Sequence, residues 1–305
     1  MSLTIDFDFE NVTVTTFGVG IDAGDDQTFV VVPVDVDVQR ALCEMAQATW
    51  NALNNCEDGP REYEPSEKYE SRECLYLPLD HEMAAAVKTL HEAANLPTNS
   101  GALNDPSNIF CYFAQLTDNK HRRLTALRRA TQFKGILKSR LIQLVSDSLK
   151  LIEDRVFKLD IDFDLLADSK NVYILRPSGF EFAGKLQQAI LDAVPKNIKA
   201  IQSDLPFVEL APIEEYAKKH TRAARYLASI RSQELTKNVD KSLLKALCEQ
   251  TGVEVEESDG KLKVSEGHEL AFLELLDRRR YELEFVKGQP ERFKAGNWRR
   301  INDKG

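Results

Sequence analysis

The residues of this sequence best suited to chemistry are cations concentrated between positions 118 and 140. Asp118 is the single acidic residue of that stretch. Lysine and arginine neutralise nucleic-acid phosphates, which supply most of the affinity in non-specific binding. The alternatives are a solvated face, or pairing with acidic residues of this chain or of another copy. The cations that we expect to contact DNA here are Lys120, Arg122, Arg123, Arg128, Arg129, Lys134, Lys138 and Arg140.

A second basic cluster occupies the C-terminal end and is interleaved with the aromatic residues Tyr281, Phe293 and Trp298. Arginine and aromatic side chains together suit binding to a nucleic-acid backbone or to single strands. The alternative is that the aromatic residues are core and that the run 278–280 caps a helix C-terminus, where cations are favoured. The further DNA-binding candidates here are Arg292, Lys294, Arg299 and Arg300.

Two groups of carboxylates are candidates for a metal-dependent nuclease. Asp160, Asp162 and Asp164 alternate along a predicted strand, and clustered carboxylates can hold a divalent cation. The pair Glu254 and Glu256 lies one predicted strand away from Lys261 and Lys263, although this spacing is common in any charged hairpin.

Other enzyme signatures are missing from the sequence. It has no GxSxG, P-loop, GxGxxG or HExxH motif, and its five histidines do not cluster. We therefore expect no catalytic residue, no metal and no cofactor, and a binding module is favoured over an enzyme.

The charge is polarised along the chain. Residues 1–117 carry 5 Lys and Arg against 20 Asp and Glu, whereas residues 118–305 carry 35 against 29. Such polarity concerns partners rather than fold. The acidic third is expected to face away from DNA, toward a protein partner or toward the basic face of another copy, which favours a homodimer.

The sequence features favour a cytoplasmic location. The N-terminus lacks the basic and apolar regions of a secretory signal, and no apolar run reaches the length of about 18 residues that spans a membrane. The five cysteines contain no CxxC pair, which suits reduced thiols.

The patterns predict both strands and helices in the first half. We expect a hairpin over 12–34, a helix from the N-cap Asp35 to about Asn54, an acidic loop over 55–73 and a helix over 81–94. The apolar run from Ile109 predicts a strand, whereas 122–145 fits a helix or strands. Strict alternation over 157–164 predicts a strand with one buried face.

The last third is predicted to be more helical. A strand at 171–175 and a turn at 176–179 precede helices at about 183–193, 212–233, 239–250 and 267–276. Helix 212–233 has a basic face that either meets phosphate or is an ordinary surface. Gly252 is a predicted C-cap, Ser258-Asp259-Gly260 a hairpin turn, and 281–286 a strand.

Residues 133–181 resemble the KwaB family of the Kiwa antiphage defence system. The pattern lies in VFKLDIDFDLL (Val156–Leu166), in NVYIL and its turn into Phe180-Glu181, and later in LELLDRRRYELEFV (Leu273–Val286). The similarity covers roughly 120–300. It implies a bacterial defence protein that binds DNA without strong sequence preference, acts with the membrane protein KwaA, and blocks phage DNA replication or expression.

Together these observations predict an α+β protein. Its N-terminal α/β subdomain has an antiparallel sheet, and a mixed β-rich and helical region follows. We expect an acidic domain at 1–105 and a KwaB-like domain at 106–305, β-rich over 106–182 and helical over 183–305. The expected partners are DNA, a KwaA-like membrane protein that recruits the chain to the inner membrane, and a second copy. The alternatives are a nuclease of a defence system and an assembly adaptor without a nucleic-acid role.

Overall fold

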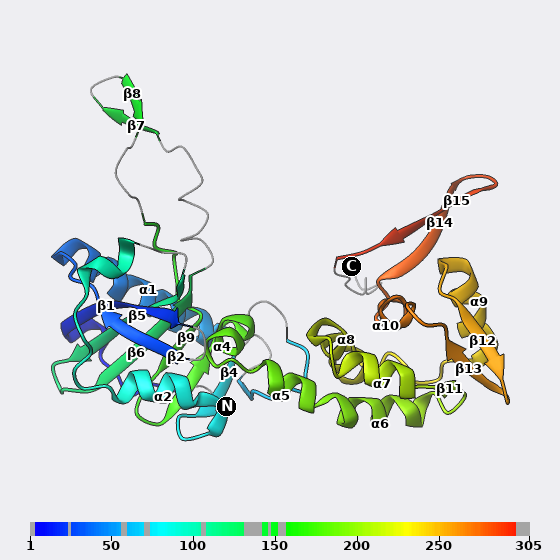
Figure 1. Cartoon of the computed structure of the whole chain (residues 1–305). Helices are drawn as coiled ribbons and strands as arrows, with labels where there is room; N and C mark the ends of the chain where they lie inside the picture. The colour runs from blue at the N-terminus through cyan, green and yellow to red at the C-terminus, as the bar shows by residue number, and fades with distance from the viewer. Residues whose placement is uncertain are drawn as a thin grey trace. The chain divides into compact units, whose positions relative to one another are not determined.

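The structure is a computed structural model that divides into two compact units. It describes residues 4–23, 26–55, 60–69, 74–104, 108–130, 142–145, 148–151 and 157–296. Unit 1 comprises residues 1–63 and 69–186, and unit 2 comprises 64–68 and 187–305 (Figure 1). The boundary expected at 105/106 lies inside unit 1, because the strands on either side of it pair with each other.

Unit 1 is built on one eight-stranded sheet of order β2-β1-β5-β6-β9-β10-β4-β3. All neighbours are antiparallel except β3 and β4. The strands are β1 (Val12–Ala23), β2 (Asp26–Val31), β3 (Arg61–Glu62), β4 (Leu75–Pro78), β5 (Ile109–Asp118), β6 (Arg123–Arg129), β9 (Leu165–Ala167) and β10 (Asn171–Ile174). The predicted hairpin near the N-terminus and the predicted strand from Ile109 are confirmed.

Helices cover both faces of this sheet. Tyr112 and Phe113, neighbours on β5, point into different apolar clusters, as strand alternation requires. The first cluster contains buried residues of α1 (Val36–Asn54), and the second contains those of α2 (Ala85–Glu92) and α4 (Pro177–Ala183). The Asp35 side chain accepts a hydrogen bond from the Val38 amide at 2.9 Å, so the predicted N-cap of α1 is confirmed. The 3₁₀ helices of unit 1 are η1 (Phe9–Asn11), η2 (Glu82–Ala84) and η3 (Ser100–Asn104).

The predicted strand over 157–164 is wrong. Residues 157–164 form no strand, and β9 begins only at Leu165. Alternation predicted that Ile161 and Phe163 share a buried face, yet Ile161 is 76% exposed while Phe163 is buried. Ion pairs of the intervening aspartates, described below, hold this segment in place of a hydrogen-bonded ladder.

The ambiguous stretch 122–145 contains strands in its described part. Beyond β6, a separate two-stranded antiparallel sheet consists of β7 (Ile142–Val145) and β8 (Ser148–Leu151). Residues 131–141 lie outside the described residues.

Unit 2 is a helical unit with a small sheet. Its core joins all its helices to the three-stranded sheet β11-β13-β12. The helices are α5 (Gln187–Asp192), α6 (Val194–Asp204), α7 (Ala211–Ala217), α8 (Thr221–Ser232), α9 (Lys241–Thr251) and α10 (Glu269–Leu276). The strands are β11 (Val208–Glu209), β12 (Val255–Ser258) and β13 (Lys261–Val264), with the separate hairpin β14 (Arg280–Val286) and β15 (Gln289–Lys294).

Local signals in unit 2 predicted the turns better than the helix lengths. Gly252 ends α9 with φ 71°, and Asp259 and Gly260 both have positive φ in the β12–β13 turn, so these predictions are confirmed. The helix predicted over 212–233 is two helices, because His220 is extended between α7 and α8. The turn predicted at 176–179 is the start of α4.

The cysteines differ from the expectation in one respect. Cys43, Cys111 and Cys248 are free thiols, but Cys74 is disulfide-bonded. The prediction of reduced thiols is therefore wrong for Cys74. In the described part of the chain, the helices fall short of the length and apolar character that crossing a bilayer requires.

Gly18 on β1 allows a stability test of the sheet. A Cβ at this position would lie 2.5 Å from the Val30 carbonyl oxygen and would collide with the ring of Phe113. Because that carbonyl belongs to the neighbouring strand, we expect Gly18→Ala to lower the free energy of unfolding by about 1–3 kcal/mol in urea denaturation. Gly296→Ala is the control, since no atom lies within 4 Å of its Cβ. Equal stability of the two variants would contradict this packing.

Candidate nucleic-acid interface

Arg128, expected at a DNA surface, instead binds carboxylates inside unit 1. Its Nε lies 3.1 Å from Asp160 Oδ2, and its Nη1 lies 2.7 Å from Asp164 Oδ1 and 3.6 Å from Asp162 Oδ1. Only 15% of the Arg128 side chain is exposed. The Tyr112 hydroxyl donates to Asp160 at 2.8 Å.

A second arginine, Arg176, completes this acid–arginine cluster. Its Nη2 lies 2.7 and 2.8 Å from the two carboxylate oxygens of Asp162, and its Nη1 donates to the Phe163 carbonyl at 2.9 Å. The three aspartate side chains are 11% exposed or less. The cluster therefore consists of Asp160, Asp162, Asp164, Arg128 and Arg176.

Burial and ion pairing act in opposite directions on the titration of the cluster. Burial raises the pKa of Asp164 above its usual range, even though Arg128, the Arg129 amide and Arg176 favour the carboxylate. Burial alone would lower the pKa of Arg128, but the charges of Asp164 and Asp160 outweigh it and raise that pKa. Both guanidinium groups are thus committed to stabilising buried acids.

The same geometry removes the support for a metal site at these aspartates. Their oxygens face guanidinium groups, whereas a divalent cation requires oxygens directed at one shared point. Within the described ranges, no group of His, Cys, Asp and Glu is arranged to hold a metal ion. In the other candidate, Glu256 pairs in register with Lys263 on an exposed hairpin.

Arg122, which precedes β6, and Arg123 at its start are also engaged in unit 1. Arg122 binds Asp118 and Asp6. Arg123 donates to the carbonyls of His91 and Ala93 at 2.8 and 2.9 Å, where α2 ends.

Arg129 lies with its guanidinium carbon 3.9 Å from the ring centroid of Phe182. Lys120, in contrast, is exposed. The predicted residues Lys134, Lys138, Arg140, Arg299 and Arg300 lie outside the described residues.

Unit 2 contains a cluster with the opposite charge balance. Glu274, 2% exposed, accepts from Arg222 at 3.3 Å and from Arg280 at 3.2 Å, and it also binds Lys294. Asp277, fully buried, binds Arg279 and Ser229. We call this set of Arg222, Arg279, Arg280, Lys294, Glu274 and Asp277 the cation cluster.

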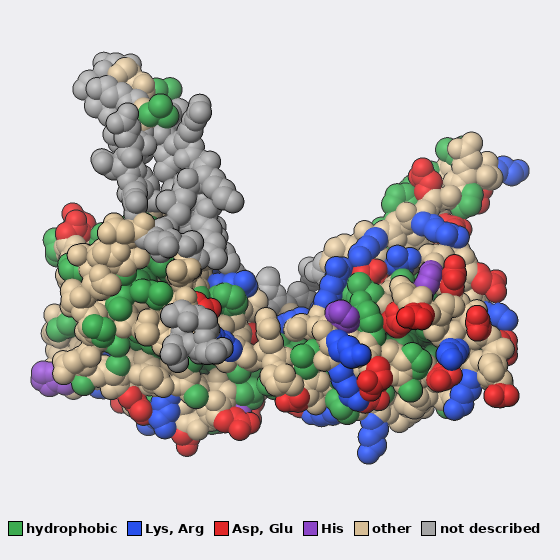
Figure 2. Space-filling model, viewed as in Figure 1, with side chains coloured by type: hydrophobic (Ala, Val, Ile, Leu, Met, Phe, Trp, Pro, Cys, Tyr) green, Lys and Arg blue, Asp and Glu red, His purple; other side chains and the backbone are tan. Residues whose placement is uncertain are grey.

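The cation cluster has more positive groups than acids and partly faces solvent. The side chains of Arg222 and Lys294 are 59% and 46% exposed, above acids that are almost completely buried. The guanidinium carbons of Arg222 and Arg279 also lie 5.6 and 5.1 Å from the ring centroid of Tyr226. Lysine, arginine and acidic side chains are intermixed on the visible face of unit 2 (Figure 2).

Among the C-terminal candidates, Lys294 belongs to this cluster, whereas the guanidinium of Arg292, on β15, contacts the C-terminal end of α9. Arg292 Nε donates to the Gln250 carbonyl at 2.8 Å. The sequence patterns had indicated the basic face of 212–233 and the run 278–280, but nothing in the sequence indicated that Arg222 meets Glu274. Arg176 was missed entirely, although the alternating aspartates were a signal for a cationic partner.

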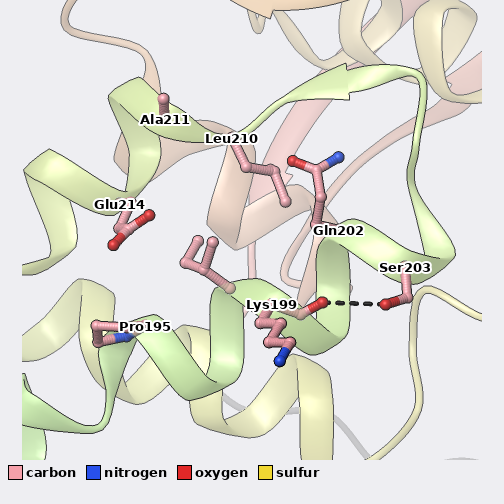
Figure 3. A pocket seen from close by; sticks show the side chains of 8 residues that line it. Pro195, Lys199, Gln202, Ser203, Leu210, Ala211 and Glu214 are labelled. Atoms are coloured by element: carbon pink, nitrogen blue, oxygen red, sulfur yellow. Dashed lines mark hydrogen bonds between the residues drawn. The ribbon is translucent and has the colours of Figure 1, made fainter.

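An open groove of about 540 Å³ lies between α6 and α7 (Figure 3). Its lining includes the buried Ile198 and Leu210, with Lys199 and Glu214 among its polar residues. The Gln202 amide donates to the carbonyls of Leu205 and Val208, so it serves the fold. This groove assembles no nucleophile with a base.

A comparison with protein-family models shows which family the chain belongs to. Residues 107–284 match the family described as Kiwa protein KwaB-like. The chain belongs to this family. The matched range includes β6, the acid–arginine cluster and most of the cation cluster. Neither a curated protein nor a solved structure matches the chain.

The resemblance to KwaB seen in the sequence is therefore confirmed, and it associates the chain with Kiwa antiphage defence. One of the segments that carry the resemblance, VFKLDIDFDLL, does not form the single strand that its alternation predicts.

The acid–arginine cluster predicts a pH-dependent loss in Arg128→Met. Removing the cation leaves Asp160 and Asp164 poorly compensated, which typically costs about 3–5 kcal/mol. The loss should be largest near neutral pH, because the already raised pKa of Asp164 rises further. At a pH below 3.8, the pKa of Asp164 in the unfolded chain, this side chain is protonated and needs no cation. The free energy of unfolding, measured in urea at neutral pH and below pH 3.8, tests this prediction. Arg40→Met, at a 64% exposed surface position, is the control. A loss independent of pH would contradict the charge explanation.

The pKa of Asp118 is shifted in the opposite direction to that of Asp164. Burial raises its pKa, but Arg122 and the amides of Arg122, Asp8 and Lys120 outweigh burial and lower the pKa to about 2. The carboxylate thus adds stability above pH 3.8, and this contribution is lost as the pH falls through about 2.

Asp118→Asn should therefore be less stable than the parent at neutral pH, and the difference should shrink as the pH falls toward about 2. Unfolding curves at both ends of this range measure it. Asp37→Asn, at a 77% exposed position, is the matched control. A difference that persists in acid would mean that Asp118 acts through shape rather than charge.

Proposed function

We propose that this KwaB-like chain binds DNA without sequence preference through the cation cluster of unit 2. The observation that carries the proposal is the charge balance of that cluster, in which two buried acids hold four cations with part of their side chains in solvent. Cations held in place by buried carboxylates lose little conformational freedom when phosphates bind.

The main DNA contacts proposed here lie in the cation cluster and not at the cations of 118–140 that the sequence pattern favoured. Arg122, Arg123, Arg128 and Arg129 are engaged within unit 1, so their substitution would report on folding rather than on DNA. Lys120 and Lys294 remain proposed contacts, because both have exposed side chains. Arg292 is proposed as a peripheral contact, since its side chain is 57% exposed.

The family match supports a proposal for the cellular role. We propose that the chain acts in the cytoplasm with a KwaA-like membrane partner and that DNA binding interferes with replication or expression of phage DNA. The family match supports the defence context. The partner and the step that is blocked are part of the proposal.

The test is DNA binding by a chain with three neutralised cations. We expect Arg222→Gln/Arg292→Gln/Lys294→Gln to weaken binding to a duplex of arbitrary sequence roughly tenfold or more at low salt. Each lost phosphate contact should also reduce the slope of log affinity against log salt by about 0.9. Fluorescence anisotropy at several salt concentrations gives both quantities.

The matched control is Lys237→Gln/Lys241→Gln/Lys245→Gln, which changes the net charge equally. These lysines bind Glu234 and Glu257 away from the cation cluster. If both triple variants bind as the parent does, or if the parent does not bind at low salt, the proposal is wrong.

A further inference from the structure

The hairpin β14–β15 has its charged face turned toward α9 and α10. Arg280 and Lys294, which are register partners, both bind Glu274 on α10. Arg292 reaches carbonyls at the end of α9, and its register partner Glu282 has only 17% of its side chain exposed. The polar side of the hairpin is thus used for attachment to α9 and α10.

The apolar face of the same hairpin lies in solvent. Tyr281 and Phe293 stack with ring centroids 5.8 Å apart, and Phe285 contacts Phe293 edge-on at 6.4 Å. Phe285 is 78% exposed, Leu283 42% and Tyr281 40%. A sheet with one solvated face normally exposes its polar side, so this reversed arrangement marks an interaction surface.

The chemistry of this surface favours a strand over a phosphate-bearing partner. The charged residue on its apolar side is an acid, Glu291, opposite Leu283 in the register. Within the described residues, neither outer edge of this two-stranded sheet is paired. Pro290 has no amide hydrogen and weakens the β15 edge, so β14 is the edge suited to a further strand.

The chain itself supplies a strand of matching character. Leu149 and Leu151 on β8 are 67% and 58% exposed. The β7–β8 pair is also a separate two-stranded sheet, a structure that is marginally stable alone. In the sequence, Lys150 separates these leucines just as Glu284 separates Leu283 from Phe285.

We propose that β8 of one copy pairs antiparallel with β14 of a second copy and completes a four-stranded sheet. Leu149 then lies beside Phe285, and Leu151 beside Leu283. Each copy offers both strands, and the proposal is a two-fold dimer in which the contact forms twice, reciprocally. The inference does not depend on DNA binding, because none of the paired residues belongs to the cation cluster.

The first experiment is oxidative cross-linking of two full-length variants, Leu149→Cys and Phe285→Cys, carrying different tags. Directly opposite residues in an antiparallel pair bring their Cβ atoms within about 4.5–5.5 Å, close to the range of a disulfide. We expect a cross-linked product joining the two tags in the mixture, and much less in either variant alone or in the parent. Absence of the mixed product would overturn the proposal, as would stronger linkage of Phe285→Cys to itself.

The second experiment measures association by sedimentation velocity over a range of concentrations. Leu149→Ser/Leu151→Ser and Leu283→Ser/Phe285→Ser should each abolish the dimer, because either change removes one side of both contacts. The control is Val36→Ser/Leu243→Ser, at two other exposed apolar positions, 66% and 57% exposed. A monomeric parent, equal loss in the control, or a Leu149→Cys/Phe285→Cys chain that cross-links within one copy would each overturn the proposal.

Discussion

The ion pairs of Arg128 and Arg176 with three aspartates are the interaction on which unit 1 depends. Residues 157–164 have no hydrogen-bonded ladder, so these pairs fix the segment against the sheet. Asp164 is the central residue, since its amide donates to Leu127 and its carbonyl accepts from Leu175 and Arg176. Gly179 is required beside it, because a Cβ there would collide with the carboxylate. Buried acids of this kind are tolerated only when cations compensate them.

The same principle produces a different result in unit 2. Glu274 and Asp277 are as deeply buried as the aspartates of unit 1, but the cations around them outnumber them and extend toward solvent. Two arginines face three acids in the acid–arginine cluster of unit 1, whereas four cations face two acids in the cation cluster of unit 2. This difference, rather than the density of lysine and arginine along the chain, is the basis for proposing the cation cluster as the phosphate-binding surface.

The reversed hairpin β14–β15 is linked to this arrangement. Arg280 and Lys294 bind Glu274 from the inner face of the hairpin, and strand alternation then turns Tyr281 and Phe293 outward. One buried acid on α10 thus organises both the cation cluster and the orientation of an exposed apolar face. The family match includes Glu274 and most of β14, because it ends at residue 284.

The α+β class, the family and the features set by near neighbours can all be predicted from the amino-acid sequence. The Asp35 cap, the left-handed Gly252 and the Asp259-Gly260 turn follow from local backbone preferences. Which charges meet depends on the folded chain, because Arg128 and Asp160 are 32 residues apart and Arg222 and Glu274 are 52 apart. Alternation over 157–164 misled for the same reason, since long-range ion pairs outweighed the period of the apolar residues. A cation's availability to a partner depends on such contacts, and these form only when the chain folds.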